Sequence, residues 1–345
     1  MSTVPSAYLA PSLPAPSLRV VHDVKEERRE QLRRNGNFSL SYHTLQEGLK
    51  YHHSDWGYIA YEKKWGYTFV LADPVVDPNY TEEALDDFLA HHKKPSFCQV
   101  SAPMARLLQD RGFLINEFGT EFEIDLSDYT ISGKKKRHIK EATNRLRNLG
   151  MQVVERSISE LDRSEVEAVS DTWRDGKVVK ENETRFLSRG IVLEDEEDVR
   201  KFYLLDSDGS IVAYIYFDPI YQDDEVIGYL SNIKRHREDA PRDFDFAMTW
   251  HAIQQFQQEG KQILSLGMAP FYELEDTNPE FQPNKVTSYC LRKIYQHSKR
   301  TMLNFEGMAA HKRRYRGDSF KVYYASPARF NVLRLLTLGK VCRMF

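Results

Sequence analysis

The sequence predicts an α+β fold of two similar units in tandem, each with a mixed central sheet flanked by helices. The chain has 345 residues, which is too long for one small domain and suits two domains of ordinary size. Apolar periodicity in the first half gives the order strand, strand, helix, strand, helix, strand, and a comparable order returns in the second half. Recurrence of one order along one chain indicates a duplicated unit.

The composition is that of a globular protein, with 41% hydrophobic residues, 29% charged residues and a formal net charge of −3. No apolar run of about 18 residues is present, so the sequence predicts no transmembrane helix. The cysteines Cys98, Cys290 and Cys342 lie far apart, which favours neither a disulfide framework nor a zinc cluster. We therefore expect a cytoplasmic protein in a reducing compartment.

The chain divides into four predicted segments. Residues 1–22 are rich in Pro and Ser and lack the apolar core of a secretory signal, so we expect a flexible leader. Residues 23–130 form the first predicted domain and residues 131–150 a basic linking helix. Residues 151–345 form the second domain, in which we look for the chemistry.

The first unit begins with a charged helix at 26–34. Residues 57–76 (GYIAYEKKWGYTFVLADPVV) predict two adjacent strands, the second ending where Pro74 prevents pairing. Residues 80–94 predict an amphipathic helix with an acidic first turn and a basic last turn, as the helix dipole favours. A short strand at 95–101, a helix at 102–112 closed by Gly112, and one or two strands at 113–126 complete the unit.

The second unit follows a basic helix at 134–150. A hairpin at 201–221 is indicated by the turn Asp208-Gly209 between two apolar runs. A strand at 226–236 then leads through a basic loop into a helix at 245–260. The remaining predicted elements are a strand at 151–157, a helix at 159–175, a strand at 261–270, helices at 286–298 and 304–316, a strand at 320–326 and a C-terminal helix.

The order strand, basic loop, helix, strand is the core of the acetyltransferase (GNAT) fold. The loop of that fold normally carries Gln/Arg-x-x-Gly-x-Gly/Ala, whose bare N–H groups cradle the pyrophosphate of coenzyme A at a helix N-terminus. The matching stretch at 235–248 (RHREDAPRDFDFAM) has no glycine, one proline and the acidic residues Glu238, Asp239 and Asp243 before the helix. An acyl-CoA donor is therefore disfavoured, and measurable coenzyme A binding would restore that alternative.

Four motifs carry a family resemblance: LADPVV at 71–76, DAPRDFDFAM at 239–248, SLGMAP at 265–270 and NFEGMAAHKRRY at 304–315. Together they resemble the catalytic domain of aminoacyl-phosphatidylglycerol synthases, the lysyl- and alanyl-transferases of the multiple-peptide-resistance type. The resemblance covers about residues 38–326. The sequence departs from the family pattern at Ala72 (Gly in the family), His311 (Phe), Arg314 (Lys) and near Ser319 (Trp).

The resemblance implies a tandem GNAT fold that takes an amino acid from an aminoacyl-tRNA, with no cofactor and no metal. In the membrane synthases the acceptor is a lipid hydroxyl, whereas free-standing relatives aminoacylate small molecules such as hydroxylamines or sterols. We therefore expect two partners, an aminoacyl-tRNA and a small-molecule or lipid acceptor bearing a hydroxyl or amine. A degenerate tandem GNAT that only binds RNA or a protein partner is the non-enzymatic alternative.

Lys312 is the leading candidate for catalysis. On a helix at 305–316, the 3.6-residue period places Lys312 on one face with Phe305, Met308 and Tyr315. A lysine in an apolar stripe can stabilise the negative charge of a tetrahedral intermediate or bind a phosphate; the alternative is a snorkelling side chain. Arg314 falls on the opposite side, as a second catalytic candidate or a solvated, tRNA-facing arginine.

Four more residues are candidates for the reaction site. Asp245 opens a helix, where it either caps exposed N–H groups or binds the aminoacyl α-ammonium. Asn232 and Ser265 are polar residues in apolar strands and could line a substrate groove, although such residues more often satisfy local hydrogen bonds. His311 could contact substrate or accept a proton, but the family's apolar residue at this position favours a packing or surface role.

The helix at 134–147 carries a nearly continuous basic side over an apolar stripe of Ile139, Ala142 and Leu146. Such charge attracts a phosphate backbone without reading its sequence. The predicted tRNA-binding residues are Lys134, Lys135, Lys136, Arg137 and Lys140. An ordinary solvated helix and an anionic membrane contact are the alternatives. The C-terminal segment at 328–345 is also amphipathic; we favour docking on its own domain over peripheral membrane contact.

Overall fold

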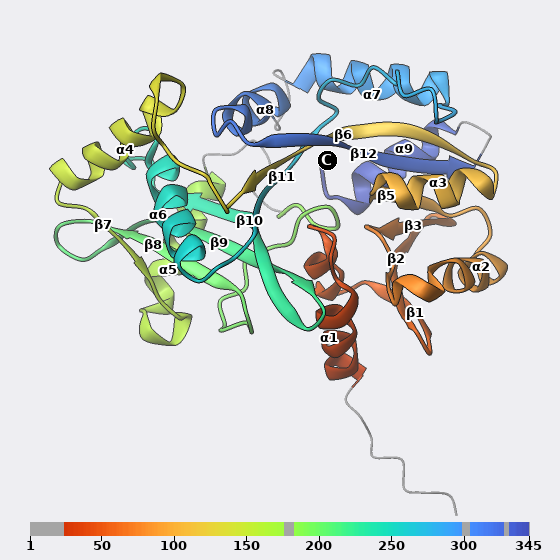
Figure 1. Ribbon diagram of the computed structural model, residues 1–345, viewed down its shortest axis with the longest axis horizontal. Helices are drawn as coiled ribbons and strands as arrows, with labels where there is room; N and C mark the ends of the chain where they lie inside the picture. The colour runs from red at the N-terminus through yellow and green to blue at the C-terminus, as the bar shows by residue number, and fades with distance from the viewer. Residues whose placement is uncertain (1–23, 176–182, 299–303, 328–330, 345) are drawn as a thin grey trace, which may run out of the picture.

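The computed structural model describes residues 24–175, 183–298, 304–327 and 331–344, and Figure 1 shows the arrangement of the chain. The predicted leader at 1–22 lies outside these residues. The strands are β1 (Lys50–Ser54), β2 (Gly57–Lys64), β3 (Tyr67–Leu71), β4 (Val75–Val76), β5 (Ser96–Val100), β6 (Phe113–Asp125), β7 (Gln152–Glu155), β8 (Arg200–Leu205), β9 (Ile211–Gln222), β10 (Glu225–His236), β11 (Ile263–Pro270) and β12 (Asp318–Pro327). The helices are α1 (Val24–Asn35), α2 (Thr81–His91), α3 (Ala102–Asp110), α4 (Arg137–Asn148), α5 (Arg163–Asp175), α6 (Phe244–Gln258), α7 (Lys285–His297), α8 (Phe305–Arg313) and α9 (Val332–Val341), with short 3₁₀ helices that include η1 (Ser41–Leu45) and η3 (Lys134–Lys136).

Local sequence signals account for several element boundaries. The Oγ of Ser101 accepts a hydrogen bond from the N–H of Met104 and so caps α3. The helix α7 is capped in the same way by Asn284, whose side chain accepts from two backbone N–H groups. Gly209 has φ of 89° at the tip of the β8–β9 hairpin, a conformation that glycine adopts without steric cost.

Within the described part of the chain, the strands all join one mixed sheet of 12 strands, in the order β1-β2-β3-β5-β12-β6-β11-β10-β9-β8-β7, with β4 beside β2. Apart from β7 at one edge, the order is symmetric about the β12–β6 pair. Each half supplies an antiparallel meander followed by a parallel pair, β3 with β5 and β10 with β11. The parallel pair after a meander and a crossover helix is the GNAT arrangement, so the predicted fold class and its duplication are confirmed.

The two halves exchange their last strands. Strand β12, from the end of the chain, lies between β5 and β6 of the first half and is antiparallel to both. Strand β6, from the end of the first half, in turn lies between β12 and β11. The predicted second domain at 151–345 thus places β12 in the first half of the sheet, and α9 packs against β2 and β3 of the same half.

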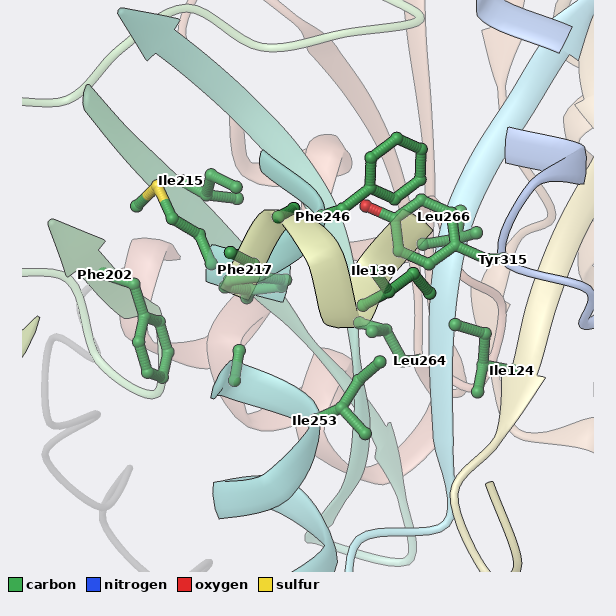
Figure 2. Packing of buried hydrophobic residues seen from close by; sticks show 14 of the residues in the cluster. Ile124, Ile139, Phe202, Ile215, Phe217, Phe246, Ile253, Leu264, Leu266 and Tyr315 are labelled. Atoms are coloured by element: carbon green, nitrogen blue, oxygen red, sulfur yellow. The ribbon is translucent and has the colours of Figure 1, made fainter. Parts of the chain in front are cut away.

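Helices cover both faces of the sheet. In the first half, α2 and α3 pack on one face, and α1 and α9 on the other, where α7 and α8 join the same apolar cluster. In the second half, α4 and α6 cover one face and α5 the opposite face. Figure 2 shows the α4–α6 side, where Ile139, Phe246 and Ile253 meet Leu264 and Tyr315. The stripe predicted on the basic helix is therefore buried as expected.

The structure differs from the predicted elements in a few places. Strand β1 was not predicted, and residues 57–76 form three strands because the chain turns again to pair β4 with β2. Residues 113–126 give one long strand, since β6 is paired on both sides along its length. The helix predicted at 304–316 ends at Arg313. Among the described residues, no helix has the length and apolar character needed to cross a membrane.

Candidate active site

A cavity opens where the parallel strands β10 and β11 separate. They pair over Gly228–Ile263, Tyr229–Leu264 and Leu230–Ser265 and no further. Just beyond these pairs, each strand has an irregularity in its antiparallel partnership, β10 between Ser231 and Ile233 and β11 between Ser265 and Gly267. Bulges of this kind turn strands apart and occur often beside active sites.

The cavity has two adjoining lobes. The polar lobe has a volume of about 600 Å³ and is lined by residues of β10, α6 and α8 together with Trp173 and Arg343. The apolar lobe, of about 220 Å³, lies between the two halves and is lined mainly by apolar side chains, such as those of Leu40, Phe118 and Phe271. The residues that line both lobes are Thr184, Ser231, Asn232, Leu266, Met308 and Lys312.

Lys312 reaches from α8 to the junction of the lobes, where its Nζ donates a hydrogen bond of 2.8 Å to the carbonyl oxygen of Met268. Burial lowers the pKa of Lys312 to about 7, against the opposing effect of the Glu121 carboxylate. Gly267 stands beside the ammonium, and a Cβ there would lie 3.4 Å from Nζ. The lysine that was predicted on an apolar stripe therefore lines the cavity, and its pKa lies close to neutral pH.

Glu121 is the buried acid beside this lysine. It lies on β6, at the centre of the sheet, and its Oε1 accepts a hydrogen bond of 2.8 Å from the hydroxyl of Ser265. Burial raises the pKa of Glu121, partly offset by hydrogen bonds and by Lys312. Ser265 was expected to line the groove, but it is fully buried and its hydroxyl also accepts from the N–H of Gly267. Its position is a correction: Ser265 holds Glu121 and the β11 bulge instead of facing the cavity.

A second charged group forms at the polar lobe around Asp245. Its Oδ2 lies 2.7 Å from Nζ of Lys234 and 3.0 Å from Nε2 of His311. Although burial opposes ionisation, these two partners hold the pKa of Asp245 far below its usual range. Burial and the nearby Lys234 lower the pKa of His311, despite its contact with Asp245.

The helix-capping reading of Asp245 is confirmed in part, because its Oδ1 accepts a hydrogen bond of 3.1 Å from the N–H of Phe246 in the first turn of α6. Asp243, with φ of 62°, occupies the N-cap position two residues earlier, but its side chain makes no capping hydrogen bond. His311, for which a packing or surface role was favoured, lines the polar lobe. Its ring also lies 4.5 Å from that of Phe246, so it packs and faces the cavity at once. Asn232 lines both lobes, as predicted.

Arg314 is placed outside the lining of both lobes. Its Nη1 lies 3.1 Å from Oδ1 of Asp243, and its guanidinium is 4.4 Å from the Phe246 ring centroid. The helix α8 ends at Arg313, which directs Arg314 along the surface towards the start of α6. The catalytic reading of Arg314 therefore lacks contact with the cavity, and a surface role fits its position.

The mouth of the polar lobe is basic and aromatic. The guanidinium of Arg235 stacks 3.7 Å from the ring centroid of Trp173 and lies 3.4 Å from a carboxylate oxygen of Glu183. Arg174, His236 and Arg343 line the same lobe. Cations therefore outnumber carboxylates here, which suits an anionic ligand.

The predicted basic helix lies on the surface of the second half. Lys134, Lys135, Arg137 and Lys140 are exposed. Lys136 is partly covered: its ammonium stands 3.6 Å over the Tyr129 ring and donates to the carbonyl of Thr130. Arg137 is paired with Glu141. Four of the five predicted side chains are therefore accessible to a large ligand.

Sequence reasoning missed Lys234 and Glu121. Lys234 lies near the end of the predicted strand at 226–236 and was not singled out there. Glu121 is one of several acids in GTEFEID, and its burial depends on β6 being central, which in turn depends on β12. Because Glu117, Glu123 and Asp125 lie on the same strand, no signal within the strand distinguishes Glu121.

Among the described residues, the group His52, Asp87 and His91 brings its ligand atoms within 4.8 Å of one another. It lies on β1 and α2 of the first half and lines neither lobe of the cavity. The expectation of no metal in the reaction stays a prediction.

Comparison with known proteins gives consistent matches. The model of the family described as phosphatidylglycerol lysyltransferase, C-terminal, matches residues 29–326. The phosphatidylglycerol lysyltransferase of Bacillus subtilis is 26% identical over 284 residues, which cover 79% of this chain and 32% of that protein. The Staphylococcus haemolyticus protein of the same name is 23% identical over 270 residues, 76% of this chain and 31% of that protein. This chain thus spans about a third of the length of these relatives.

Solved structures share the fold. L-PGS from Bacillus licheniformis superposes with a TM-score of 0.75 at 19% identity, covering 92% of this chain and 96% of that chain. The C-terminal domain of a putative lysylphosphatidylglycerol synthetase from Agrobacterium fabrum gives a TM-score of 0.73 at 19% identity, covering 91% and 94%. Because the family model spans most of the chain, including the strands and helices that build the cavity, the protein belongs to the phosphatidylglycerol lysyltransferase C-terminal family.

Proposed function

We propose that the protein is an aminoacyltransferase that moves an amino acid from an aminoacyl-tRNA to the hydroxyl of a lipid, with phosphatidylglycerol as the first acceptor to test. Membership of the family supports the transfer and the lipid. The observation that carries the proposal is the position of Lys312, a buried ammonium at the junction of a basic polar lobe and an apolar lobe. One lobe suits an anionic donor and the other an apolar acceptor.

The ester of an aminoacyl-tRNA is already reactive, so the protein has to position the reactants and stabilise developing charge. The acceptor oxygen attacks the ester carbonyl to give a tetrahedral intermediate. The protonated form of Lys312 stabilises the negative charge on the carbonyl oxygen of this intermediate. When the intermediate collapses, the bond to the ribose oxygen breaks and that oxygen takes up a proton in place of the one that the acceptor hydroxyl has lost. Asp245 holds Lys234 and His311 against the polar lobe, where Lys234 meets the phosphate of the tRNA 3′ end.

Basic residues extend from the polar lobe to the predicted tRNA-binding helix. The pKa of His138, on α4, is lowered by burial and by the nearby Arg314 and Arg316, with Asp243 opposing. This links the start of α4 to the end of α8 in one positive region. A tRNA whose 3′ end enters the polar lobe would cross this region, where Lys134, Lys135, Arg137 and Lys140 contact its phosphates. Donors of this size need such contacts because phosphate attraction supplies most of the affinity.

An acyl-CoA donor has weaker support. In the structure the two carboxylates at the start of α6 are ion-paired, Asp243 with Arg314 and Asp245 with Lys234, which reduces their repulsion of a pyrophosphate. The loop still lacks a glycine cradle, and Pro241 removes one N–H from it. Calorimetric titration with coenzyme A tests this alternative, and saturable binding would favour it.

Peripheral membrane contact is part of the same proposal. The helix α9 buries Thr337, Leu338 and Val341 and so docks on its own fold, but it exposes Val332, Leu333 and Leu336 by 51%, 59% and 47%. Cys342 and Met344, just after α9, line the apolar lobe. A bilayer in contact with the exposed residues would bring its lipids beside that lobe.

Vesicle flotation tests this contact. The double variant Leu333→Ser/Leu336→Ser, which removes apolar surface without adding charge, should lose binding to phosphatidylglycerol vesicles, whereas Leu149→Ser, at an equally exposed position after α4, should not. Equal binding of both variants and the wild type would contradict the contact.

The decisive experiment is transfer of label. The purified chain is incubated with vesicles of phosphatidylglycerol and with tRNA charged with each labelled amino acid in turn, and the lipids are then extracted. Label in the lipid fraction that requires intact tRNA supports the proposal. In a parallel reaction, small molecules from cell extract replace the vesicles. Label in a water-soluble product of that reaction would instead assign a small-molecule acceptor. No tRNA-dependent transfer in either fraction would contradict the proposal and favour the non-enzymatic alternative.

A further inference from the structure

A histidine of the first half reaches the apolar lobe. His43 lies in η1, is 2% exposed, and lines this lobe opposite the strands of the second half. Its Nε2 is 3.2 Å from Oδ2 of Asp218, on β9. Among the described residues, neither ring nitrogen of His43 makes a hydrogen bond of good geometry: Nε2 is held at ion-pair distance from Asp218, and Nδ1 has no hydrogen-bond partner.

Asp218 fixes the state of this histidine. Although burial opposes its ionisation, Arg189 holds the pKa of Asp218 at about 2, and Nε of Arg189 lies 2.9 Å from its Oδ2. The carboxylate is therefore charged and attracts a proton on Nε2 of His43. In a neutral imidazole that tautomer leaves a lone pair on Nδ1. Nδ1 is thus a buried hydrogen-bond acceptor on a residue that lines a mostly apolar lobe.

A buried polar atom without a partner costs about 1–3 kcal/mol, so such atoms commonly await a ligand or water. A second one lies on the same lobe: Nδ2 of Asn232, at the β10 bulge, also has no partner among the described residues. One atom accepts a hydrogen bond and the other donates one. A hydroxyl group can satisfy both, because its proton goes to one partner and its oxygen accepts from the other.

We propose that His43 is a binding residue for the acceptor: its Nδ1 accepts a hydrogen bond from the acceptor hydroxyl, and Asn232 donates one to the oxygen of the same hydroxyl. This inference rests on the proposed function and assigns to the first half a direct part in acceptor recognition. Asp218 and Arg189 are positioning residues, because they act through His43. The hydroxyl is thereby held in the lobe whose far end is formed by Lys312.

Two substitutions separate this role from a structural one. In His43→Gln the amide nitrogen can occupy the place of Nε2 and keep the contact with Asp218, but nothing replaces Nδ1. In His43→Asn the amide oxygen can occupy the place of Nδ1, while the contact with Asp218 is lost. A merely structural histidine would tolerate Gln better than Asn, whereas an acceptor-binding histidine would tolerate Asn better than Gln.

Binding is measured first, by calorimetry with soluble dihexanoyl-phosphatidylglycerol, which has headgroup hydroxyls, and dihexanoyl-phosphatidylcholine, which has none. We expect His43→Gln to bind the phosphatidylglycerol about 10-fold more weakly at an unchanged unfolding temperature, the usual effect of one lost hydrogen bond. His43→Asn should bind it more tightly than His43→Gln does. Wild-type affinity in His43→Gln, or no preference of the wild type for phosphatidylglycerol, would overturn the inference.

The transfer assay then separates the two proposals. A wild type that binds the hydroxyl lipid through His43 but transfers nothing to it contradicts the proposed function alone. A wild type that transfers amino acid, with a His43→Gln variant of equal KM for the lipid, contradicts the role of His43 alone. The KM for aminoacyl-tRNA should be the same in wild type and variant, because His43 faces the other lobe.

Discussion

The same pair of parallel strands is closed in the first half and open in the second. Beyond the last β3–β5 pair, the N–H of Ala72 still donates to the carbonyl of Cys98 and the N–H of Ser101 donates to Asp73. Beyond the last β10–β11 pair, bulges turn the strands apart and Lys312 reaches the carbonyl of Met268. A buried backbone group needs a partner. In the first half, neighbouring groups of the chain supply all the partners, and the wedge between the two parallel strands is closed. In the second half, the side chain of Lys312 on the separate helix α8 supplies one of them, and the wedge stays open to a ligand.

Loss of Lys312 should have the largest effect on the open wedge. Lys312→Ala is expected to lower kcat about 100- to 1000-fold, the usual cost of removing one preorganised group that stabilises transition-state charge. Steady-state transfer to lipid measures it, with Lys312→Arg as the variant that keeps a charge. A fully folded Lys312→Ala protein that keeps wild-type kcat would reduce Lys312 to a packing role.

Loss of Asp245 should lower transfer less than loss of Lys312 does, but more than loss of the neighbouring Asp243. Asp245→Asn weakens the hold on Lys234 and His311, so we expect transfer to fall about 10- to 100-fold. Asp243→Asn is the matched control, since it removes a half-exposed ion pair two residues away and should change stability by less than about 1 kcal/mol. Equal losses of kcat/KM in the two variants would show that neither carboxylate is specific to the reaction.

The pH dependence of kcat tests the charge on Lys312. With its pKa at about 7, the ammonium loses its proton as pH rises through this value, so transfer should decline there. Glu121→Gln removes a negative charge that raises the pKa of Lys312, and the decline should move to lower pH by up to about 1 unit. Single-turnover rates between about pH 5.5 and 8.5 measure the midpoint. A midpoint that stays fixed, or a rate that climbs with pH, would contradict a role for the charged form.

The closed wedge should affect stability and leave chemistry alone. Burial raises the pKa of Asp73 from its usual value of 3.8 to about 6. The folded state therefore binds this proton more tightly than the unfolded state, and the resulting stability is present below about pH 4 and lost as pH rises through about 6. Urea unfolding should show the wild type losing about 3 kcal/mol relative to Asp73→Asn between pH 4 and 7. The contrary result is a difference that does not vary with pH, and transfer per folded molecule should be equal.

Most of the fold could be predicted from patterns of residues that lie close together in the sequence. The helices and strands follow periodicity, caps and turn residues, and Lys312 could be selected because a charge interrupted an apolar stripe. Asp245 and Asn232 were also found, and for Asp245 the expected cap is present as a hydrogen bond from the N–H of Phe246. These residues share one property: the signal lies within a few positions of the residue itself.

What could not be predicted depends on contacts between distant parts of the chain. Ser265 was assigned to the groove because its partner, Glu121, is 144 positions away. Arg314 was assigned to catalysis by family position, but the end of α8 turns it towards Asp243. His43 gave no signal, since its neighbour Asp218 comes from the other half. The pairing of β12 with β5 could not be predicted for the same reason, because the two strands are far apart in the sequence.

The exchange of β6 and β12 also constrains how the protein is made. Neither half of the sheet is complete until the last residue of β12, Pro327, has been synthesised and β12 has entered between β5 and β6. Before that step the growing chain carries open strand edges, which invite pairing with other chains. Contacts between segments so far apart in sequence form slowly. Expression of either half alone should thus give an aggregation-prone fragment. Neither half can be removed or transferred to another protein without the other.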